Sequence, residues 1–184
     1  MIQKFKKLES KLIHKAHIFD FYEEKVQLPN GKIDYYDVLK HKGAAAVIPV
    51  LPDGRILMVK QYRNALDRIT VEIPAGGINV GETAIQAAYR ELEEEAGYRT
   101  DHLEHIISIR TAVAFCNELI EVYIANNLIP SNQNLDEDEF IEVEAYELKE
   151  LMNMIFVGTI EDSKTISSIM SYYAFLEKQS HTIE

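Results

Sequence analysis

The stretch that decides the fold is Gly76–Tyr98, which reads GGINVGETAIQAAYRELEEEAGY. Its second half is rich in helix-forming residues, and Thr83 followed three residues later by Gln86 predicts a capping box at the start of a helix. Gly97 predicts where this helix ends, because glycine readily adopts the left-handed conformation that often closes a helix. We therefore expect a capped helix of about three turns.

Glutamates crowd the C-terminal end of this helix, where the exposed carbonyl groups already form the negative pole of the helix dipole. Glu91, Glu94 and Glu95 have the spacing i, i+3 and i+4, so they project from one arc of the helix. Carboxylate oxygens grouped in this way suit a hard divalent cation, and we expect Mg²⁺ or Mn²⁺. A second arc, which we expect to face the core, holds Ile85, Ala88 and Leu92.

The same stretch resembles the signature of the Nudix family. That signature requires glycine, five residues, glutamate, seven residues, and then arginine, glutamate, an apolar residue, any residue, two glutamates, any residue, glycine and an apolar residue. The matching residues are Gly76, Glu82, Arg90, Glu91, Leu92, Glu94, Glu95, Gly97 and Tyr98. A solvated, glutamate-rich helix face is the usual meaning of an acidic run, but it explains neither the glycines nor the position of the carboxylates.

The resemblance implies an α/β (α+β) fold, namely a Nudix-type α/β/α sandwich of helices around a mixed sheet. Strand-like runs on both sides of the acidic helix, followed by helical periodicity, agree with this architecture. We expect residues 1–42 to form a small N-terminal antiparallel β unit, in which Asn30 and Gly31 predict a hairpin turn, and residues 43–184 to form the Nudix domain. The first fifteen residues fit a strand, a helix or a poorly ordered end.

Residues of the motif define a predicted metal site. We expect Glu91, Glu94 and Glu95 to bind the metal, and Ala75 to add its backbone carbonyl, because the glycines that follow let the main chain turn close to the site. Arg90 can pair with Glu94 at i+4 and orient it, although an ordinary surface ion pair is an alternative. Metal held in this way neutralises a pyrophosphate and activates water, so Glu94, Glu95 and Arg90 are predicted catalytic residues.

Likeness beyond the motif points to the ADP-ribose and ADP-sugar pyrophosphatases of this family. It covers most of residues 17–175 through the segments 28–32, 42–47, 59–63, 71–76 and 138–143. It implies that Arg63 contacts the substrate phosphates. It also implies that a glutamate of the late acidic loop, Glu139 or Glu137, activates water or binds metal, with Glu139 the better positional match. The alternatives are a surface cation at a strand end and a solvated acidic loop.

Further substrate contacts follow from the same resemblance. The family forms dimers in which the N-terminal unit places aromatic side chains on the nucleotide base. Tyr36 is the best positional candidate and Phe19 is a second one, while core or interface packing is the alternative for each. Glu118 matches a position that contacts the distal ribose, against the alternative of a surface glutamate. Glu82 either contacts the substrate or favours the helix dipole.

One loop departs from the subgroup pattern. Residues 112–115 read Ala-Val-Ala-Phe where the subgroup usually has Ser-Pro-Gly-Phe. Without Pro and Gly, at Val113 and Ala114, the loop has different backbone preferences. We therefore expect weak discrimination between ADP-ribose and other ADP-sugars.

Composition narrows the classes of function. The 184 residues suffice for a domain with a sizeable core, and a formal charge of −11 argues against a nucleic-acid or anionic membrane surface. No apolar run reaches the roughly 18 residues of a membrane helix, and the N-terminus lacks a signal-type segment. The single cysteine, Cys116, cannot form an internal disulfide, which agrees with a reducing compartment. We expect a cytoplasmic protein.

The predicted function is Mg²⁺-dependent hydrolysis of the pyrophosphate bond of ADP-ribose to AMP and ribose 5-phosphate, or of related ADP-sugars. Two alternatives stay open: a Nudix hydrolase that acts on another nucleoside diphosphate derivative, and a non-catalytic Nudix module that senses nucleotides. The intact carboxylates Glu91, Glu94 and Glu95 count against a pure sensor, which does not require clustered metal ligands.

Overall fold

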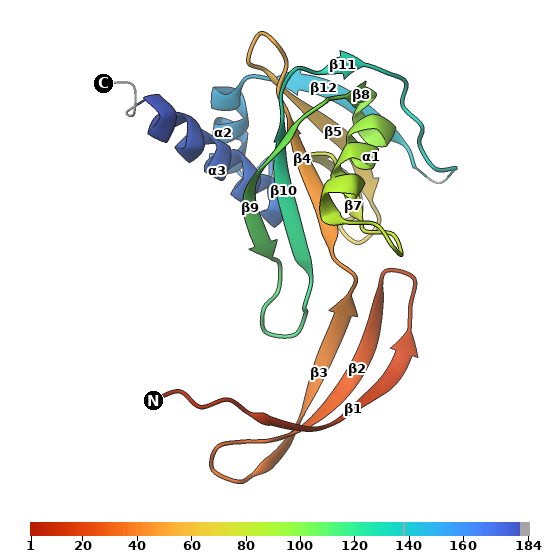
Figure 1. The fold of residues 1–184 in the computed structure, drawn as a ribbon, viewed down its shortest axis with the longest axis vertical. Coiled ribbons are helices and arrows are strands. Elements are labelled where there is room, and N and C mark those ends of the chain that lie inside the picture. Colours follow the sequence, from red (N-terminus) through yellow and green to blue (C-terminus); the bar gives the residue numbers. More distant parts are fainter. Residues whose placement is uncertain (138, 181–184) are drawn as a thin grey trace. The chain divides into compact units, whose positions relative to one another are not determined.

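The computed structural model describes residues 1–137 and 139–180, so Asp138 of the predicted acidic loop lies outside the described residues. The chain divides into two compact units, which can be followed by the sequence colours in Figure 1. A loop from the middle of the chain belongs with the N-terminal strands, which the division predicted at residue 42 did not include. The ranges are Met1–Gly43 with Arg110–Leu119, and Ala44–Ile109 with Ile120–Glu184.

The first unit is built on a three-stranded antiparallel sheet in the order β1-β2-β3. Its strands are β1 (Lys6–Lys15), β2 (Phe19–Gln27) and β3 (Ile33–His41). The predicted turn is confirmed, because Gly31 has φ 85° and Asn30 Oδ1 accepts a hydrogen bond from the Lys32 amide at 3.0 Å. Most of the undecided N-terminal segment is therefore a strand.

The loop of the first unit is fixed to β3 by main-chain and side-chain hydrogen bonds. The Leu39 amide donates to the Phe115 carbonyl at 2.7 Å, and the Asn117 amide donates to the Leu39 carbonyl at 3.2 Å. The Asn117 side chain accepts a hydrogen bond from the His41 amide at 2.7 Å. This loop, which lacks Pro and Gly, is therefore tied down along its length, while Val113 and Phe115 expose their side chains.

The second unit is organised around a four-stranded mixed sheet in the order β7-β4-β10-β9. Strands β4 and β10 run parallel, and β4 and β7 run antiparallel. These strands are β4 (Ala44–Pro49), β7 (Ala75–Gly77), β9 (Leu103–Arg110) and β10 (Leu119–Ala125). A second sheet, β12-β5-β6, and a short strand pair complete the unit: β5 (Ile56–Arg63), β6 (Arg68–Glu72), β12 (Ile141–Tyr146), β8 (Tyr98–Arg99) and β11 (Ile129–Pro130).

Helices cover both faces of the four-stranded sheet, with α1 on one face and α2 and α3 on the other (Figure 1). The helices are α1 (Ala84–Ala96), α2 (Leu148–Phe156) and α3 (Ser163–Ser180). All residues of β4 are buried and alternate between two cores: Ala45 and Val47 pack with α1, whereas Ala46 and Ile48 pack with α2 and α3. The predicted α/β/α sandwich is confirmed. No described helix is both long and apolar enough to cross a membrane.

The ends of α1 are those that the sequence predicts. Thr83 and Gln86 form the capping box, with both reciprocal hydrogen bonds present. Gly97 closes the helix in the left-handed conformation at φ 72°, and its amide bonds back to the last turn. The strand that leads into the motif and the helix that follows are thus set by local sequence.

The buried face of α1 differs from the prediction. Glu91 and Glu95 lie on the buried face together with Ala88 and Leu92, whereas Ile85 is 39% exposed. The prediction of an apolar face separate from a carboxylate face was therefore wrong. The spacing from Ala88 explains this, because residues three, four and seven positions later lie on the same side of a helix. The buried face of α1 therefore includes two carboxylates.

Candidate active site

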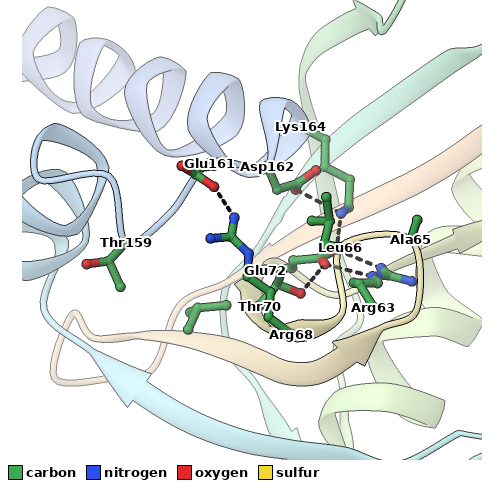
Figure 2. A pocket seen from close by; sticks show the side chains of 11 residues that line it. Arg63, Ala65, Leu66, Arg68, Thr70, Glu72, Thr159, Glu161, Asp162 and Lys164 are labelled. Atoms are coloured by element: carbon green, nitrogen blue, oxygen red, sulfur yellow. Dashed lines mark hydrogen bonds and ion pairs between the residues drawn. The ribbon is translucent and has the colours of Figure 1, made fainter.

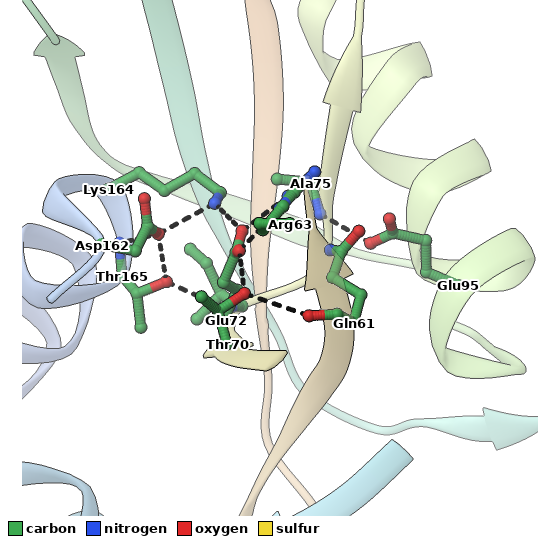
Figure 3. Close-up of polar contacts among 10 residues, drawn as sticks. Gln61, Arg63, Thr70, Glu72, Ala75, Glu95, Asp162, Lys164 and Thr165 are labelled. Atoms are coloured by element: carbon green, nitrogen blue, oxygen red, sulfur yellow. Dashed lines mark hydrogen bonds and ion pairs between the residues drawn. The ribbon is translucent and has the colours of Figure 1, made fainter. Parts of the chain in front are cut away.

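Glu95 lies deep between α1 and β7. It is 3% exposed, and its Oε2 accepts a hydrogen bond from the Ala75 amide at 2.8 Å (Figure 3). The preceding carbonyl, that of Pro74, accepts a hydrogen bond from the Val47 amide of β4 at 2.9 Å. Because successive strand residues face opposite edges, Ala75 directs its N–H and C=O away from β4 and toward α1. The Ala75 carbonyl thus lies on the carboxylate side of β7.

Glu91 packs directly on the backbone of β7. It is 6% exposed, and a Cβ atom added at Gly76 would overlap its carboxylate group. Only glycine leaves room for this side chain, so the first glycine of the motif is required by close approach. The space for a buried carboxylate is therefore built into the strand.

Arg90 connects the acidic residues of the motif. Its Nη1 donates to Glu94 Oε2 at 2.9 Å, which confirms the predicted i, i+4 pair, and also to Glu91. Its Nε and Nη2 donate to the Glu82 carboxylate at 3.0 and 3.1 Å, and Nη2 donates to the Gly77 carbonyl at 2.9 Å. The hydrogen bonds with these carboxylates, that of Glu82 above all, raise the pKa of Arg90. Glu82 therefore pairs with Arg90, another residue of the motif.

The two buried carboxyl groups of α1 have raised pKa values. Burial raises the pKa of Glu91 to about 7 and the pKa of Glu95 to about 8. Hydrogen bonds oppose the rise, but neighbouring charges add to it: Glu94 acts on Glu91, and Glu139 of the acidic loop acts on both buried groups. Glu139 therefore lies within electrostatic reach of the helix, and a cation placed here would stabilise all of these carboxylates.

The donor atoms fit a hard divalent cation, because carboxylate and backbone carbonyl oxygens are its ordinary ligands. The groups that would hold it are the Glu91, Glu94 and Glu95 carboxylates and the Ala75 carbonyl. Within residues 1–137 and 139–180, no three acidic, His or Cys side chains are already gathered into a metal site. Arg90 engages Glu91 and Glu94, and the Ala75 amide engages Glu95, so metal binding requires some of these hydrogen bonds to be exchanged.

Arg63, at the end of β5, pairs with a buried carboxylate. Its Nε and Nη2 each donate to Glu72 at 2.7 Å, a bidentate pair, and Glu72 is 3% exposed. The Thr70 hydroxyl at 2.6 Å and Lys164 also donate to Glu72 (Figure 3). Burial alone would raise the pKa of Glu72, but hydrogen bonds from Arg63, Lys164 and Thr70 lower it to about 2. Arg63 is thus fixed in place while its side chain stays 41% exposed.

Three residues of this network were not selected from the sequence, although it contained signals for them. Glu72 places a charge within a short apolar strand, and Lys164 places a cation in the first turn of α3, at the positive end of the helix dipole. Lys164 Nζ donates to Asp162 Oδ2 at 2.8 Å. Asp162 also caps α3, because it accepts a hydrogen bond from the Thr165 amide at 3.0 Å.

The second unit has two cavities among those lined by β5 and β6. One of about 360 Å³ is lined by Arg63, Glu72 and Lys164, among others (Figure 2). The other, of about 790 Å³, is lined by Glu139 together with the exposed apolar side chains of β5, β6 and the acidic loop, including Phe140. Both volumes lie in the range of small-molecule pockets. The first cavity is lined by Arg63 and the second by the neighbouring Tyr62, so both lie next to the end of β5.

The remaining predicted site residues are not part of the contacts described above. Glu137 is exposed on the acidic loop. Tyr36, Phe19 and Glu118 belong to the first unit, where Tyr36 is 40% exposed and Phe19 is 38% exposed. Glu118 accepts a hydrogen bond from the Thr111 hydroxyl at 2.7 Å. Substrate-binding roles for these residues stay predictions.

Comparison with known proteins identifies the family. The model of the NUDIX domain matches residues 40–167. The chain is 42% identical to the ADP-ribose pyrophosphatase of Bacillus subtilis, over 89% of this chain and 92% of that relative. It is 36% identical to the methanol dehydrogenase activator of Bacillus methanolicus, over 96% of each chain. This chain therefore belongs to the Nudix family, whose hydrolases generally need divalent metal ions.

A solved structure shares the fold over nearly the whole chain. The crystal structure of an ADP compounds hydrolase superposes with a TM-score of 0.86 and covers 97% of each chain. The two sequences are 20% identical, so the likeness concerns the fold. The arrangement of β7, α1 and the flanking sheets is thus one that known proteins also adopt.

We expect Mg²⁺ to raise the melting temperature, because it binds carboxylates that are grouped only in the folded chain. At about 100 times its Kd the gain is on the order of 2.7 kcal/mol, or roughly 5 to 10 °C for a chain of this size. Glu94→Gln should lose most of this shift. Glu93→Gln is the matched control, since Glu93 instead binds the Ser131 hydroxyl at 2.6 Å. Equal shifts in the two variants would contradict the metal assignment.

The lowered pKa of Glu72 predicts that the free energy of unfolding decreases in acid. Because its pKa is lowered from 4.5 to about 2, its ionised form stabilises the fold above about pH 4.5, and this contribution is lost as the pH falls toward about 2. The shift corresponds to a free energy on the order of 3 kcal/mol. Glu72→Gln should lower the free energy of unfolding at neutral pH and flatten its decline between about pH 5 and 3 in urea titrations. Glu104→Gln, which changes an exposed carboxylate of β9, should change neither, and the same pH slope in both variants would refute this role.

Proposed function

We propose that this protein hydrolyses the pyrophosphate bond of ADP-ribose to AMP and ribose 5-phosphate, and that it also accepts related ADP-sugars. The observation that carries this proposal is the burial of Glu91 and Glu95 within an intact Nudix motif, where α1 packs on β7 and Gly76 leaves room for Glu91. We further propose Mg²⁺ as the cofactor, with Mn²⁺ as the second choice. The near full-length likeness to a relative named ADP-ribose pyrophosphatase supports this substrate.

Different residues of the second unit would bind the metal and accept the proton in this reaction. When bound, a divalent cation neutralises the pyrophosphate and activates water at this site. Glu91, Glu94 and Glu95 would hold that cation. Glu139 would accept a proton from the attacking water, and its electrostatic effect on Glu91 and Glu95 favours it over Glu137. The water oxygen bonds to one phosphorus, the bridging P–O bond breaks, and two phosphate monoesters leave.

Substrate contacts would come from cations and from aromatic side chains. Arg63 would bind the substrate phosphates, because Glu72 fixes its guanidinium while part of it stays exposed. From the family resemblance we assign Tyr36 and Phe19 to the nucleotide base and Glu118 to the distal ribose. The exposure of the two aromatic rings supports their assignment.

We also propose that the protein is a cytoplasmic homodimer assembled through its N-terminal unit, residues 1–42. Strand β1 is exposed along its whole length and includes the exposed apolar residues Leu8, Leu12 and Ile13. Such an edge strand with apolar side chains is the kind of surface that a second chain covers. The free thiol of Cys116 supports the reducing compartment.

A second candidate function is a Nudix module that acts on a partner enzyme or senses a nucleotide. The relative named methanol dehydrogenase activator, 36% identical to this chain, favours it. Turnover separates the candidates. Purified protein should be incubated with ADP-ribose, ADP-glucose, a dinucleotide and a nucleoside triphosphate, each with and without Mg²⁺. We expect Mg²⁺-dependent release of AMP from ADP-ribose, whereas turnover of none of these compounds would favour the second candidate.

Two variants of the acidic loop test its role in the reaction. Glu139→Gln should lower kcat for ADP-ribose by about a hundredfold, because the proton acceptor is lost. For comparison, Glu94→Gln on α1 should lower kcat for ADP-ribose by about a hundredfold or more, because a metal ligand is lost. Glu137→Gln makes the same change two positions away on the same loop and should keep near wild-type turnover. Equal losses in Glu137→Gln and Glu139→Gln would show that the loop assignment is wrong.

The loop at residues 112–115, which differs from the pattern of the subgroup, leads to a prediction about substrate selectivity. Its apolar side chains Val113 and Phe115 are exposed, whereas its polar Asn117 and Glu118 bind other groups of the first unit. A loop with few free polar groups discriminates poorly between sugars. We therefore expect kcat/KM for ADP-ribose and for ADP-glucose to lie within about tenfold. The double variant Val113→Pro/Ala114→Gly should widen the ratio in favour of ADP-ribose, and a thousandfold preference in the wild type would contradict the prediction.

A further inference from the structure

The start of α3 lies outside the Nudix motif, yet it shares a buried carboxylate with Arg63. Lys164 Nζ donates to Glu72 and also to Asp162 Oδ2 at 2.8 Å. The Lys164 side chain is 12% exposed and that of Glu72 is 4% exposed. Figure 3 shows Lys164 and Arg63 reaching Glu72 from opposite sides. A lysine of the last helix thus belongs to the same hydrogen-bonded group as the proposed phosphate-binding arginine.

The same helix end also holds the main chain beside Glu72. The Ile73 amide donates to Thr165 Oγ1 at 3.1 Å, and the Thr165 hydroxyl donates to Asp162 Oδ2 at 2.6 Å. Thr165 is completely buried. The side chain of Glu72 and the backbone of the next residue are therefore both bonded to α3. This double attachment fixes where the Glu72 carboxylate lies.

The charges of this group balance only when Lys164 is present. Arg63 and Lys164 supply two positive charges against the carboxylates of Glu72 and Asp162. Without Lys164, two carboxylates would face a single guanidinium, and the wall of the 360 Å³ cavity would become negative. A buried carboxylate that has lost one of its cations is left as a poorly compensated charge, so Glu72 would no longer be held in place. The bidentate pair of Glu72 with Arg63 would then be displaced or weakened.

We propose that Lys164 is a positioning residue for Arg63. It holds Glu72, and through Glu72 it fixes the Arg63 guanidinium on the cavity wall, with Nη1 outside the bidentate pair to Glu72 and left for an anionic phosphate. Lys164 itself does not bind the substrate, because it is largely buried and its ammonium already bonds two carboxylates. The inference rests on the proposed function, in which Arg63 binds the substrate phosphates.

Steady-state kinetics with ADP-ribose and Mg²⁺ test this role. Lys164→Met should raise KM about tenfold and leave kcat within about twofold, because ground-state phosphate binding is weakened. Lys164→Arg should restore KM to within about threefold, since a guanidinium can bond both carboxylates. Lys149→Met removes an exposed lysine of α2 and should leave KM unchanged. An unchanged KM in Lys164→Met would overturn the proposal.

A double-mutant cycle separates positioning from general stability. In an Arg63→Ala background, Lys164→Met should raise KM no further, because the proposed effect of Lys164 on phosphate binding runs through Arg63. Independent, multiplicative effects would overturn the proposal. Should Lys164→Met fail to fold, the double variant Glu72→Gln/Lys164→Met removes the buried charge and its cation together. We expect that variant to fold with a raised KM, and a wild-type KM in it would also overturn the proposal.

The outcomes distinguish this inference from the proposed function. Absence of ADP-ribose turnover by the wild type with Mg²⁺ would overturn both. Wild-type turnover combined with an unchanged KM in Lys164→Met would overturn the positioning role alone. Wild-type turnover with a raised KM, an unchanged kcat and rescue by arginine would support both.

Discussion

The burial of Glu91 and Glu95 against β7 is the constraint on which the rest of the site depends. Carboxylates inside a protein are unfavourable unless hydrogen bonds or opposite charges compensate them. Here the Ala75 amide and Arg90 give part of that compensation, and the pKa values of about 7 and 8 show that it is incomplete. A divalent cation would complete it, which is why the metal-binding proposal follows from the packing of α1.

The strand beneath these carboxylates must satisfy two demands at once. It pairs with β4 along Ala75–Gly77, and it presents Ala75 and Gly76 to the helix. Glycine is needed because no side chain fits beside Glu91. The four-stranded sheet and its cores hold β7 and α1 at this close distance, so the fold serves the site chiefly by keeping one strand and one helix in contact.

Charges outside the motif extend the site toward the second sheet and α3. One hydrogen-bonded group joins Arg63 of β5, Glu72 of β6 and Lys164 of α3 to Asp162, with Glu72 buried at its centre. Such a group is rigid because Glu72, Lys164 and Asp162 each bind more than one partner, and Glu72 holds Arg63 through two hydrogen bonds. It gives the proposed phosphate-binding arginine a fixed position, and it explains how the last helix of the chain contributes to a reaction centred on the first.

The sequence by itself determined where α1 begins and ends and which side chains pair along it. The capping box, the closing Gly97 and the Arg90–Glu94 pair were all predicted, because each joins residues within one or two helical turns. Which face of α1 is buried was decided by the sheet, which takes in Glu91 and Glu95 and leaves Ile85 exposed. The pairing of Glu72 with Lys164, 92 positions apart, was likewise decided only by the packing of β6 and α3, because partners that distant in the chain meet only when the whole fold forms.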